Sequence, residues 1–209
     1  MTNSNYTHIQ LVVDRSGSMG LIKNDMNRGI LEMLEEQNKL PGKLTLGLTR
    51  FDTQIDHLVR PFAVFEDVKD ITFVEPRGGT ALNDGIGEAV VILGEALAML
   101  EEDERPGKVI VVIVTDGEEN SSREYTLDRV KTMIEKQQDE FSWEFIFLGA
   151  NIDAFDTGGG YGIPQSRSAN FDYSAGGVSY ITGTVSNLIT RSRSGDLGGF
   201  TEEEQAQTK

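Results

Sequence analysis

Apolar positions along the chain recur with two different periods, and segments of the two kinds alternate. Residues 8–14 and 108–115 are short, nearly continuous apolar runs, and the second is rich in Val and Ile, as in strands buried on both faces of a parallel sheet. Over residues 82–100, apolar side chains recur three or four positions apart, which indicates an amphipathic helix. Alternating strand and helix patterns predict an α/β fold.

The turn residues between these segments place the remaining elements. The connection Asp52-Thr53-Gln54 is so short that 55–62 should pair with 44–51 as a hairpin, antiparallel and at the sheet edge. Three glycines at 158–160 are expected to break the chain. We predict strands at 8–14, 44–51, 55–62, 108–115, 143–148 and 167–173, helices at 22–40, 82–100, 126–141 and 174–189, and a short helix at 65–68 followed by a brief strand at 71–74.

These elements predict one doubly wound α/β domain. The expected architecture is a Rossmann-like three-layer sandwich, with a mostly parallel central sheet, one antiparallel edge strand and helices on both faces. A length of 209 residues fits a single domain, which we assign to residues 1–193. Residues 194–209 are polar and are predicted to form a disordered tail.

Charge and composition narrow the classes of function. With 34 acidic and 19 basic residues, the net charge of −15 repels nucleic-acid backbones and anionic membranes and attracts cations. The chain has no cysteine, which excludes disulfides and thiolate metal sites. No apolar run approaches the roughly 20 residues of a membrane span, and residues 1–7 lack an apolar signal core. We therefore expect a cytoplasmic protein that binds neither nucleic acid nor membrane; its oligomeric state is left open.

Oxygen-bearing side chains gather at two predicted strand ends and one helix start. Asp14-Arg15-Ser16-Gly17-Ser18 follows the first strand, Arg77-Gly78-Gly79-Thr80 precedes the helix at 82–100, and Thr115-Asp116-Gly117 ends the strand at 108–115. Ligands in open α/β sheets bind at the carboxyl ends of strands, so we expect these segments to form one site. Carboxylates and hydroxyls are hard donors, which suit Mg²⁺, Mn²⁺ or Ca²⁺.

These segments resemble the metal-ion-dependent adhesion site of von Willebrand factor type A (vWA) domains. The matching positions are Asp14-x-Ser16-x-Ser18, Gly79-Thr80-Ala81-Leu82 and Thr115-Asp116-Gly117, in the family's order. The resemblance covers residues 6–190, and the segment at 145–151 is also similar to stand-alone vWA proteins of bacteria and their phages. The resemblance independently implies a Rossmann-like architecture.

The resemblance also implies a metal site and a protein-binding function. Ser16, Ser18 and Thr80 would ligate the metal through their hydroxyls, and Asp14 and Asp116 would hold it directly or through water. With only two carboxylates, the metal keeps at least one water, which a Glu or Asp of a partner protein replaces in the family. We expect a non-enzymatic, Mg²⁺-dependent adaptor in a bacterial or phage-infected cell, with Mn²⁺ or Ca²⁺ as alternative metals.

Two other functions would use the same residues. Two aspartates at neighbouring strand ends with Mg²⁺ also suit phosphoryl transfer, but a haloacid-dehalogenase-like phosphatase needs an acid where this chain has Ser16. A structural or assembly protein would use the metal for stability alone, and such a site would normally be closed by protein ligands. We therefore prefer the hypothesis of a protein-binding adaptor.

The neighbouring polar residues receive no catalytic role. Glu118 and Glu119 follow Asp116 and could tune the site, but a solvated loop is the preferred interpretation. Arg15 occupies a variable position of the motif, and no contact with a partner is assigned to it. His8 and His57, the two histidines of the chain, are interpreted as structural or surface residues.

Overall fold

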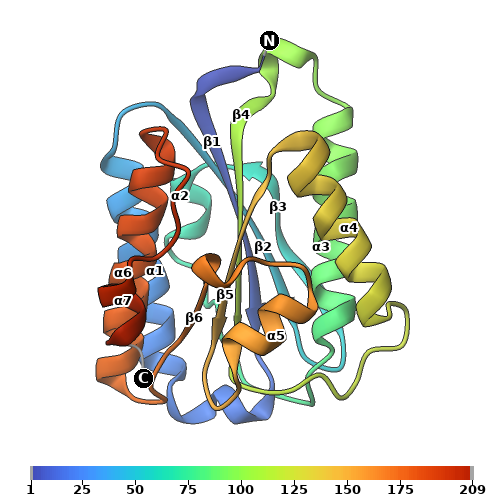
Figure 1. Ribbon diagram of the computed structural model, residues 1–209, viewed down its shortest axis with the longest axis vertical. Coiled ribbons are helices and arrows are strands. Elements are labelled where there is room, and N and C mark those ends of the chain that lie inside the picture. The colour runs from blue at the N-terminus through green and yellow to red at the C-terminus, as the bar shows by residue number, and fades with distance from the viewer. Residues whose placement is uncertain (1, 208–209) are drawn as a thin grey trace.

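The computed structural model describes residues 2–207, which form a six-stranded sheet with helices packed around it (Figure 1). The strand order is β3-β2-β1-β4-β5-β6. β3 runs antiparallel to β2, and the other neighbouring pairs are parallel. The strands are β1 (Asn3–Asp14), β2 (Lys43–Phe51), β3 (Ile55–Ala63), β4 (Pro106–Thr115), β5 (Glu144–Gly149) and β6 (Ser168–Asn170). The predicted antiparallel edge hairpin is confirmed.

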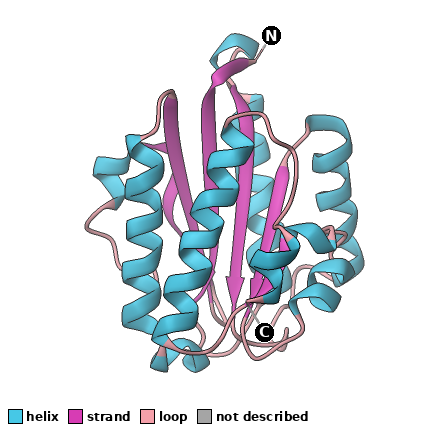
Figure 2. Cartoon of the chain, turned by 60° about the vertical axis from the view of Figure 1, so that its left-hand side comes forward, coloured by secondary structure: helices cyan, strands magenta, loops and turns pink. Residues whose placement is uncertain are grey.

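Helices cover both faces of the sheet, which gives the predicted three layers (Figure 2). α1 and α6 pack on one face, and α3 and α4 on the other. The α-helices are α1 (Lys23–Lys39), α2 (Phe65–Val68), α3 (Leu82–Ala98), α4 (Leu127–Phe141), α5 (Ala154–Gly160), α6 (Ala175–Arg193) and α7 (Glu202–Ala206). Single 3₁₀ turns are η1 (Gly17–Leu21), η2 (Glu102–Glu104) and η3 (Gln165–Arg167). The predicted doubly wound, Rossmann-like fold is confirmed.

The two central strands explain the apolar runs in the sequence. Alternate residues of β4 enter opposite cores: Ile110, Val112 and Val114 face α1 and α6, whereas Val111 and Ile113 face α3 and α4. β1 and β4 are neighbours, and the chain leaves them toward opposite sides of the sheet. The carboxyl ends of these two strands therefore flank the point where the strand order reverses, which is the usual position of a ligand site in this architecture.

Two local predictions were wrong because tertiary contacts overrode the local pattern. Residues 71–74 form no strand; the backbone N–H groups of Phe73 and Val74 both donate to Asn27 Oδ1 on α1. The glycines at 158–160 do not break the chain but end α5, a helix that Asp153 caps. A Cβ at Gly158 would lie 2.5 Å from Ser168 Oγ, so this glycine lets α5 pack closely on β6.

The C-terminal segment also differs from the prediction. Residues 194–207 of the predicted disordered tail lie against α6 and β6, and residues 208 and 209 lie outside the described part of the chain. Phe200 is buried, and Arg191 of α6 donates to both carboxylate oxygens of Glu204 at 2.9 Å. Gln205 of α7 donates to the Ser168 carbonyl of β6. One apolar side chain and one bidentate ion pair thus hold a segment whose polar composition suggested a tail.

Within residues 2–207, no helix has both the length and the apolar character that crossing a membrane requires.

Candidate functional site

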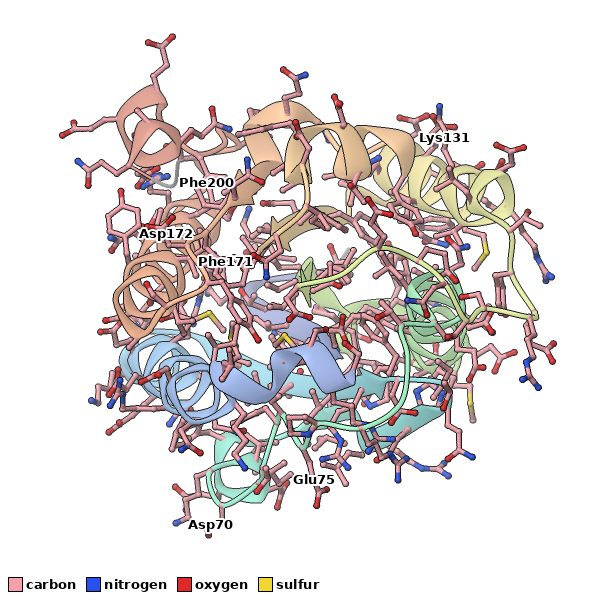
Figure 3. The ribbon with its side chains drawn as sticks, turned by 90° about the horizontal axis from the view of Figure 1, so that it is seen from below. Asp70, Glu75, Lys131, Phe171, Asp172 and Phe200 are labelled. Atoms are coloured by element: carbon pink, nitrogen blue, oxygen red, sulfur yellow. The ribbon has the colours of Figure 1, made fainter. Side chains whose placement is uncertain are left out.

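Three loops meet at the carboxyl edge of the sheet, which Figure 3 views from below. They are residues 14–18 after β1, residues 77–80 before α3, and residues 116–122 after β4. Backbone hydrogen bonds join them: Gly17 N donates to the Gly78 carbonyl at 3.2 Å, and Asn120 N donates to the Thr80 carbonyl at 3.0 Å. Gly78 adopts φ +67°, a conformation that favours glycine. The loops are therefore one connected unit.

The first carboxylate, that of Asp14, is completely buried at the end of β1. Its Oδ1 accepts a hydrogen bond of 2.6 Å from the Ser16 N–H, and its Oδ2 accepts one of 2.7 Å from the Thr115 hydroxyl at the end of β4. Asp14 therefore joins the two central strands and shapes the turn that carries Ser16. Burial raises the pKa of the Asp14 carboxyl to about 6, against the lowering effect of these hydrogen bonds.

Two hydroxyls link Asp14 to the second carboxylate. Ser16 Oγ and Ser18 Oγ share a hydrogen bond of 2.9 Å, and Ser18 Oγ donates to Asp116 Oδ1 at 2.7 Å. Asp116 Oδ2 is buried and has no hydrogen-bond partner among the described residues. Burial raises the pKa of the Asp116 carboxyl as well. The structure thus brings Asp14, Ser16, Ser18 and Asp116 together and leaves one carboxylate oxygen unsatisfied.

Thr80 completes the group. Its side chain is buried, and its backbone N–H donates to Asn120 Oδ1 at 2.9 Å. A Cβ at Gly117 would lie 3.4 Å from Thr80 Oγ1 and 3.8 Å from Ser18 Oγ, so both hydroxyls border the backbone directly after Asp116. All five residues singled out in the sequence therefore lie around one place.

The oxygen chemistry of this group fits a hard divalent cation. A buried carboxylate oxygen without a partner is costly unless a cation or proton satisfies it, and Asp116 Oδ2 is such an atom. The other donors are a second carboxylate and three hydroxyls, without nitrogen or sulfur. No three His, Cys, Asp or Glu side chains between residues 2 and 207 are grouped so that they could hold a metal. Hydroxyls would therefore have to supply much of any coordination.

Two acidic residues near the site organise its loops: Glu119, which was interpreted as solvated, and Asp84, which was not singled out in the sequence. Glu119 accepts hydrogen bonds from the backbone N–H groups of Asn83 and Ser122, as well as from the Ser122 hydroxyl, so it is not the solvated residue we expected. Asp84, in the first turn of α3, accepts from three successive backbone N–H groups at 123–125. The contacts that join α3 to the loop after β4 have no signal in the periodicity, because Asn83 lies 36 residues from Glu119 and residues 123–125 lie 39–41 residues from Asp84.

Arg15, at the variable position of the motif, is buried. Its Nε lies 2.8 Å from Asp52 Oδ2, and its Nη1 lies 3.3 Å from Asp56. Asp52 also accepts a hydrogen bond of 2.6 Å from Arg77 Nε, at the start of the second loop. This ion network ties the hairpin turn between β2 and β3 to two of the three loops.

A tyrosine from a distant segment also reaches the first loop. The Tyr173 hydroxyl, which follows β6, donates to the backbone carbonyl of Ser18. Burial and the nearby charge of Asp116 raise the pKa of Tyr173. No sequence motif singles out Tyr173, because it lies 155 residues from Ser18 along the chain.

The histidines form hydrogen bonds with residues outside the five of the candidate site, in line with their expected structural roles. His8 is fully buried in β1, with Nδ1 3.0 Å from Thr45 Oγ1. His57 of β3 is bonded to Thr49 and to Glu88 of α3.

Solved structures share this architecture, whereas no model of a protein family and no curated protein sequence matches the chain. Proximal thread matrix protein 1 from the mussel byssus, in a structure with a zinc-occupied MIDAS motif, matches with a TM-score of 0.65 and 17% identity, over 88% of this chain and 46% of that one. This chain thus spans about half the length of the mussel protein.

Two bacterial pilus proteins are similar to the same extent. The vWF domain of the type V pili tip protein Mfa5 from Porphyromonas gingivalis has a TM-score of 0.64 at 9% identity, over 90% of this chain and 95% of that one. The open conformation of the pilus adhesin SpaC from Lactobacillus rhamnosus GG has a TM-score of 0.64 at 16% identity, over 89% of this chain and 30% of that one. At these identities the likeness shows the fold, which is that of vWA-type domains.

Proposed function

We propose that the chain is a protein-binding module that recognises its partner through a divalent metal. Asp14, Ser16, Ser18, Thr80 and Asp116 would hold the ion, and an Asp or Glu side chain of the partner would complete its coordination. The observation that carries the proposal is the buried, unpartnered Oδ2 of Asp116 beside the Ser16–Ser18 hydroxyl pair. A cation would satisfy that oxygen and leave a Lewis acid for a carboxylate, since the protein supplies only two charges.

The proposed metal is Mg²⁺, with Mn²⁺ and Ca²⁺ as alternatives. Oxygen-only ligands favour these ions over softer metals. The zinc-occupied MIDAS motif of the mussel matrix protein supports a divalent ion in this fold without selecting one. A bridging metal would also explain how a chain with a net charge of −15 could attract an acidic partner.

Binding is proposed rather than catalysis. As a phosphoryl-transfer nucleophile, Asp14 would need an accessible oxygen, but its carboxylate is buried and both oxygens accept hydrogen bonds. The structures named above are described as a matrix protein, a pilus-tip domain and an adhesin. A purely structural metal is the remaining alternative, and the partner experiment below separates it from the adaptor.

The setting of the module is a prediction from the sequence. Its similarity to stand-alone vWA proteins suggests the cytoplasm of a bacterial or phage-infected cell. The pilus proteins among the structural neighbours suggest the cell surface instead. The partner and its location would decide between them.

Calorimetry tests the metal site. Chelator-treated protein is titrated with Mg²⁺ and Mn²⁺, and wild type is compared with Asp116→Asn and with Ser16→Ala/Ser18→Ala. Both variants should lose binding while keeping their circular dichroism spectra. Asp172→Asn is the matched control, because Asp172 is an exposed acid near the same edge but outside the five residues (Figure 3). No heat of binding in wild type at millimolar metal would refute the proposal.

Metal-dependent capture tests the partner. Proteins retained by the immobilised module in Mg²⁺ should elute with chelator and should be absent when Asp116→Asn is the bait. For a captured protein, one of its Asp or Glu residues should prove essential, and Asp→Asn or Glu→Gln at that position should abolish binding. Metal binding without any metal-dependent partner would favour the structural alternative.

A further inference from the structure

A cavity lies at the amino edge of the sheet, at the opposite end of β4 from the candidate metal site. Its volume is about 370 Å³, and it is bordered by the last turns of α3 and α4 and the start of β4. These three segments lie near the top of Figure 1. Cavities that hold small molecules commonly measure roughly 300–1,000 Å³. The candidate metal site accounts for none of the residues that border this cavity.

Most of the cavity wall is apolar. Leu97 of α3, Val109 of β4 and Phe141 of α4 line it together with Trp143, the one tryptophan of the chain. Trp143 is buried, whereas Phe141 is 58% exposed although it is a large apolar side chain. An exposed aromatic side chain beside an apolar cavity indicates a surface that a bound ligand could bury.

The two charged residues that line the cavity are both cations. Arg105 donates through Nε to the Leu100 carbonyl at 3.0 Å, which fixes its guanidinium at the end of α3. Lys136 lies on α4. Neither forms an ion pair with an acid of residues 2–207, although the chain has 34 acidic residues. A ligand that brings its own negative charge would complement this pair.

The geometry points to a binding site for a small apolar molecule that carries a carboxylate, such as a medium-chain fatty acid. Its hydrocarbon part would contact Leu97, Phe141 and Trp143, and its carboxylate would bind Arg105 and Lys136. The inference is independent of the proposed metal-dependent function, because it uses other residues at the opposite edge of the sheet.

Octanoate is the probe, and the intrinsic fluorescence of Trp143 is the reporter, because the chain has no other tryptophan. Octanoate should change the emission saturably and bind at least about tenfold more tightly than octanol, which has the same chain without the charge. Octylamine, which carries the opposite charge, should bind more weakly still. Equal affinity for octanoate and octanol would overturn the assignment of a carboxylate.

A cavity-filling variant tests the location. Gly94 of α3 lines the cavity, and a Cβ at this position would meet no atom within 4 Å. Gly94→Leu should therefore fill the space without strain and abolish octanoate binding. Gly183→Leu is the control, because Gly183 lies equally free of contacts on α6, at the other face of the sheet. Octanoate binding that survives Gly94→Leu would place the ligand elsewhere.

Charge variants test the two cations. Arg105→Gln and Lys136→Gln should each weaken octanoate binding about tenfold and leave octanol binding unchanged. Lys131→Gln is the control on the same helix, since Lys131, labelled in Figure 3, is not among the residues that line the cavity. Analytical ultracentrifugation tests whether the cavity instead binds a second copy of the chain. Self-association that depends on concentration and that Gly94→Leu abolishes would support this alternative, and would overturn the small-molecule assignment.

Discussion

The Tyr173 hydroxyl donates a hydrogen bond to the backbone carbonyl of Ser18, and so joins the segment between β6 and α6 to the first loop of the candidate metal site. The same serine donates its side-chain hydroxyl to Asp116. Tyr173 therefore holds the backbone of a residue whose side chain is one of the proposed ligands. The Tyr173 hydroxyl also interacts with the Asp116 carboxylate, where it lowers the pKa of Asp116. Its removal would therefore affect both the position of Ser18 and the charge of Asp116.

Removal of this hydroxyl should weaken metal binding without abolishing it. One neutral hydrogen bond contributes roughly 0.5–1.5 kcal/mol, so Tyr173→Phe should raise the Kd for Mn²⁺ about three- to tenfold in calorimetry. Tyr180→Phe is the control, because the Tyr180 hydroxyl contacts the Glu204 carbonyl at the C-terminal segment. Equal affinities of Tyr173→Phe and wild type would show that Ser18 is held in place by its own loop.

Neutralising Asp116 should stabilise the metal-free protein. Folding raises the pKa of this carboxyl through burial, which means that its ionised form is disfavoured in the folded state at neutral pH. In chelator, Asp116→Asn should therefore melt at a higher temperature than wild type, by roughly 2–4 °C for each kcal/mol gained. With millimolar Mg²⁺ the order should reverse, because only wild type gains stability from the ion.

Two thermal scans, with chelator and with Mg²⁺, check this reversal. An Asp116→Asn variant that melts below wild type in chelator would mean that the carboxylate is satisfied without metal.

Acid should destabilise the fold through His8. Complete burial lowers its pKa from 6.5 to about 3, so the folded protein keeps the ring neutral while the unfolded chain takes up a proton below pH 6.5. The unfolded state then binds more protons, and this contribution to stability is lost progressively as the pH falls from 6.5 toward 3. The slope for one proton is about 1.4 kcal/mol per pH unit.

Urea denaturation of wild type and His8→Gln between pH 7 and pH 4.5 measures this effect. The difference in unfolding free energy between the two should shrink as the pH falls, because only wild type must exclude that proton. A difference in unfolding free energy that stays constant between pH 7 and pH 4.5 would indicate that the folded protein accepts a charged ring at this position.

Arg15 should matter for stability, although it is close to the site. It is buried against Asp52, which is itself buried, so Arg15→Ala leaves part of a buried carboxylate charge uncompensated and should cost about 3 kcal/mol. Arg28→Ala is the control, because the Arg28 side chain is 60% exposed in its pair with Asp25 and should cost less than about 1 kcal/mol. Urea denaturation measures both, and equal small losses would show that Arg77 alone compensates Asp52.

Features that depend on neighbours in the chain could be predicted from the sequence. The helix predicted at 126–141 begins where Thr126 caps it, with the Thr126 side chain accepting the N–H of Arg129, because a cap needs only residues within one turn. The edge hairpin at Asp52 followed in the same way from a short connection. The meeting of the loops after β1 and β4 was also predictable, since neighbouring parallel strands end at one edge.

Features that depend on distant partners could not be predicted. The burial of Arg15 requires Asp52 and Asp56 from the hairpin, and the order of the C-terminal segment requires Arg191 to meet Glu204. Sequence periodicity records which face of an element is apolar, but it does not record which polar groups pair across elements. The contact of Tyr173 with Ser18 could not be predicted for the same reason.

The contacts of the C-terminal segment have a consequence for the behaviour of the protein at high concentration. An open sheet has two outer strands whose free peptide groups can template pairing between molecules and so lead to aggregation. Here the Gln205 side chain donates a hydrogen bond to the Ser168 carbonyl of the edge strand β6. On the opposite edge, β3 contains Pro61 and is paired with β2 out of regular register. Both edge strands are therefore less available for pairing with another molecule. Loss of residues 200–207 would expose β6 and allow it to pair with a strand of a second molecule.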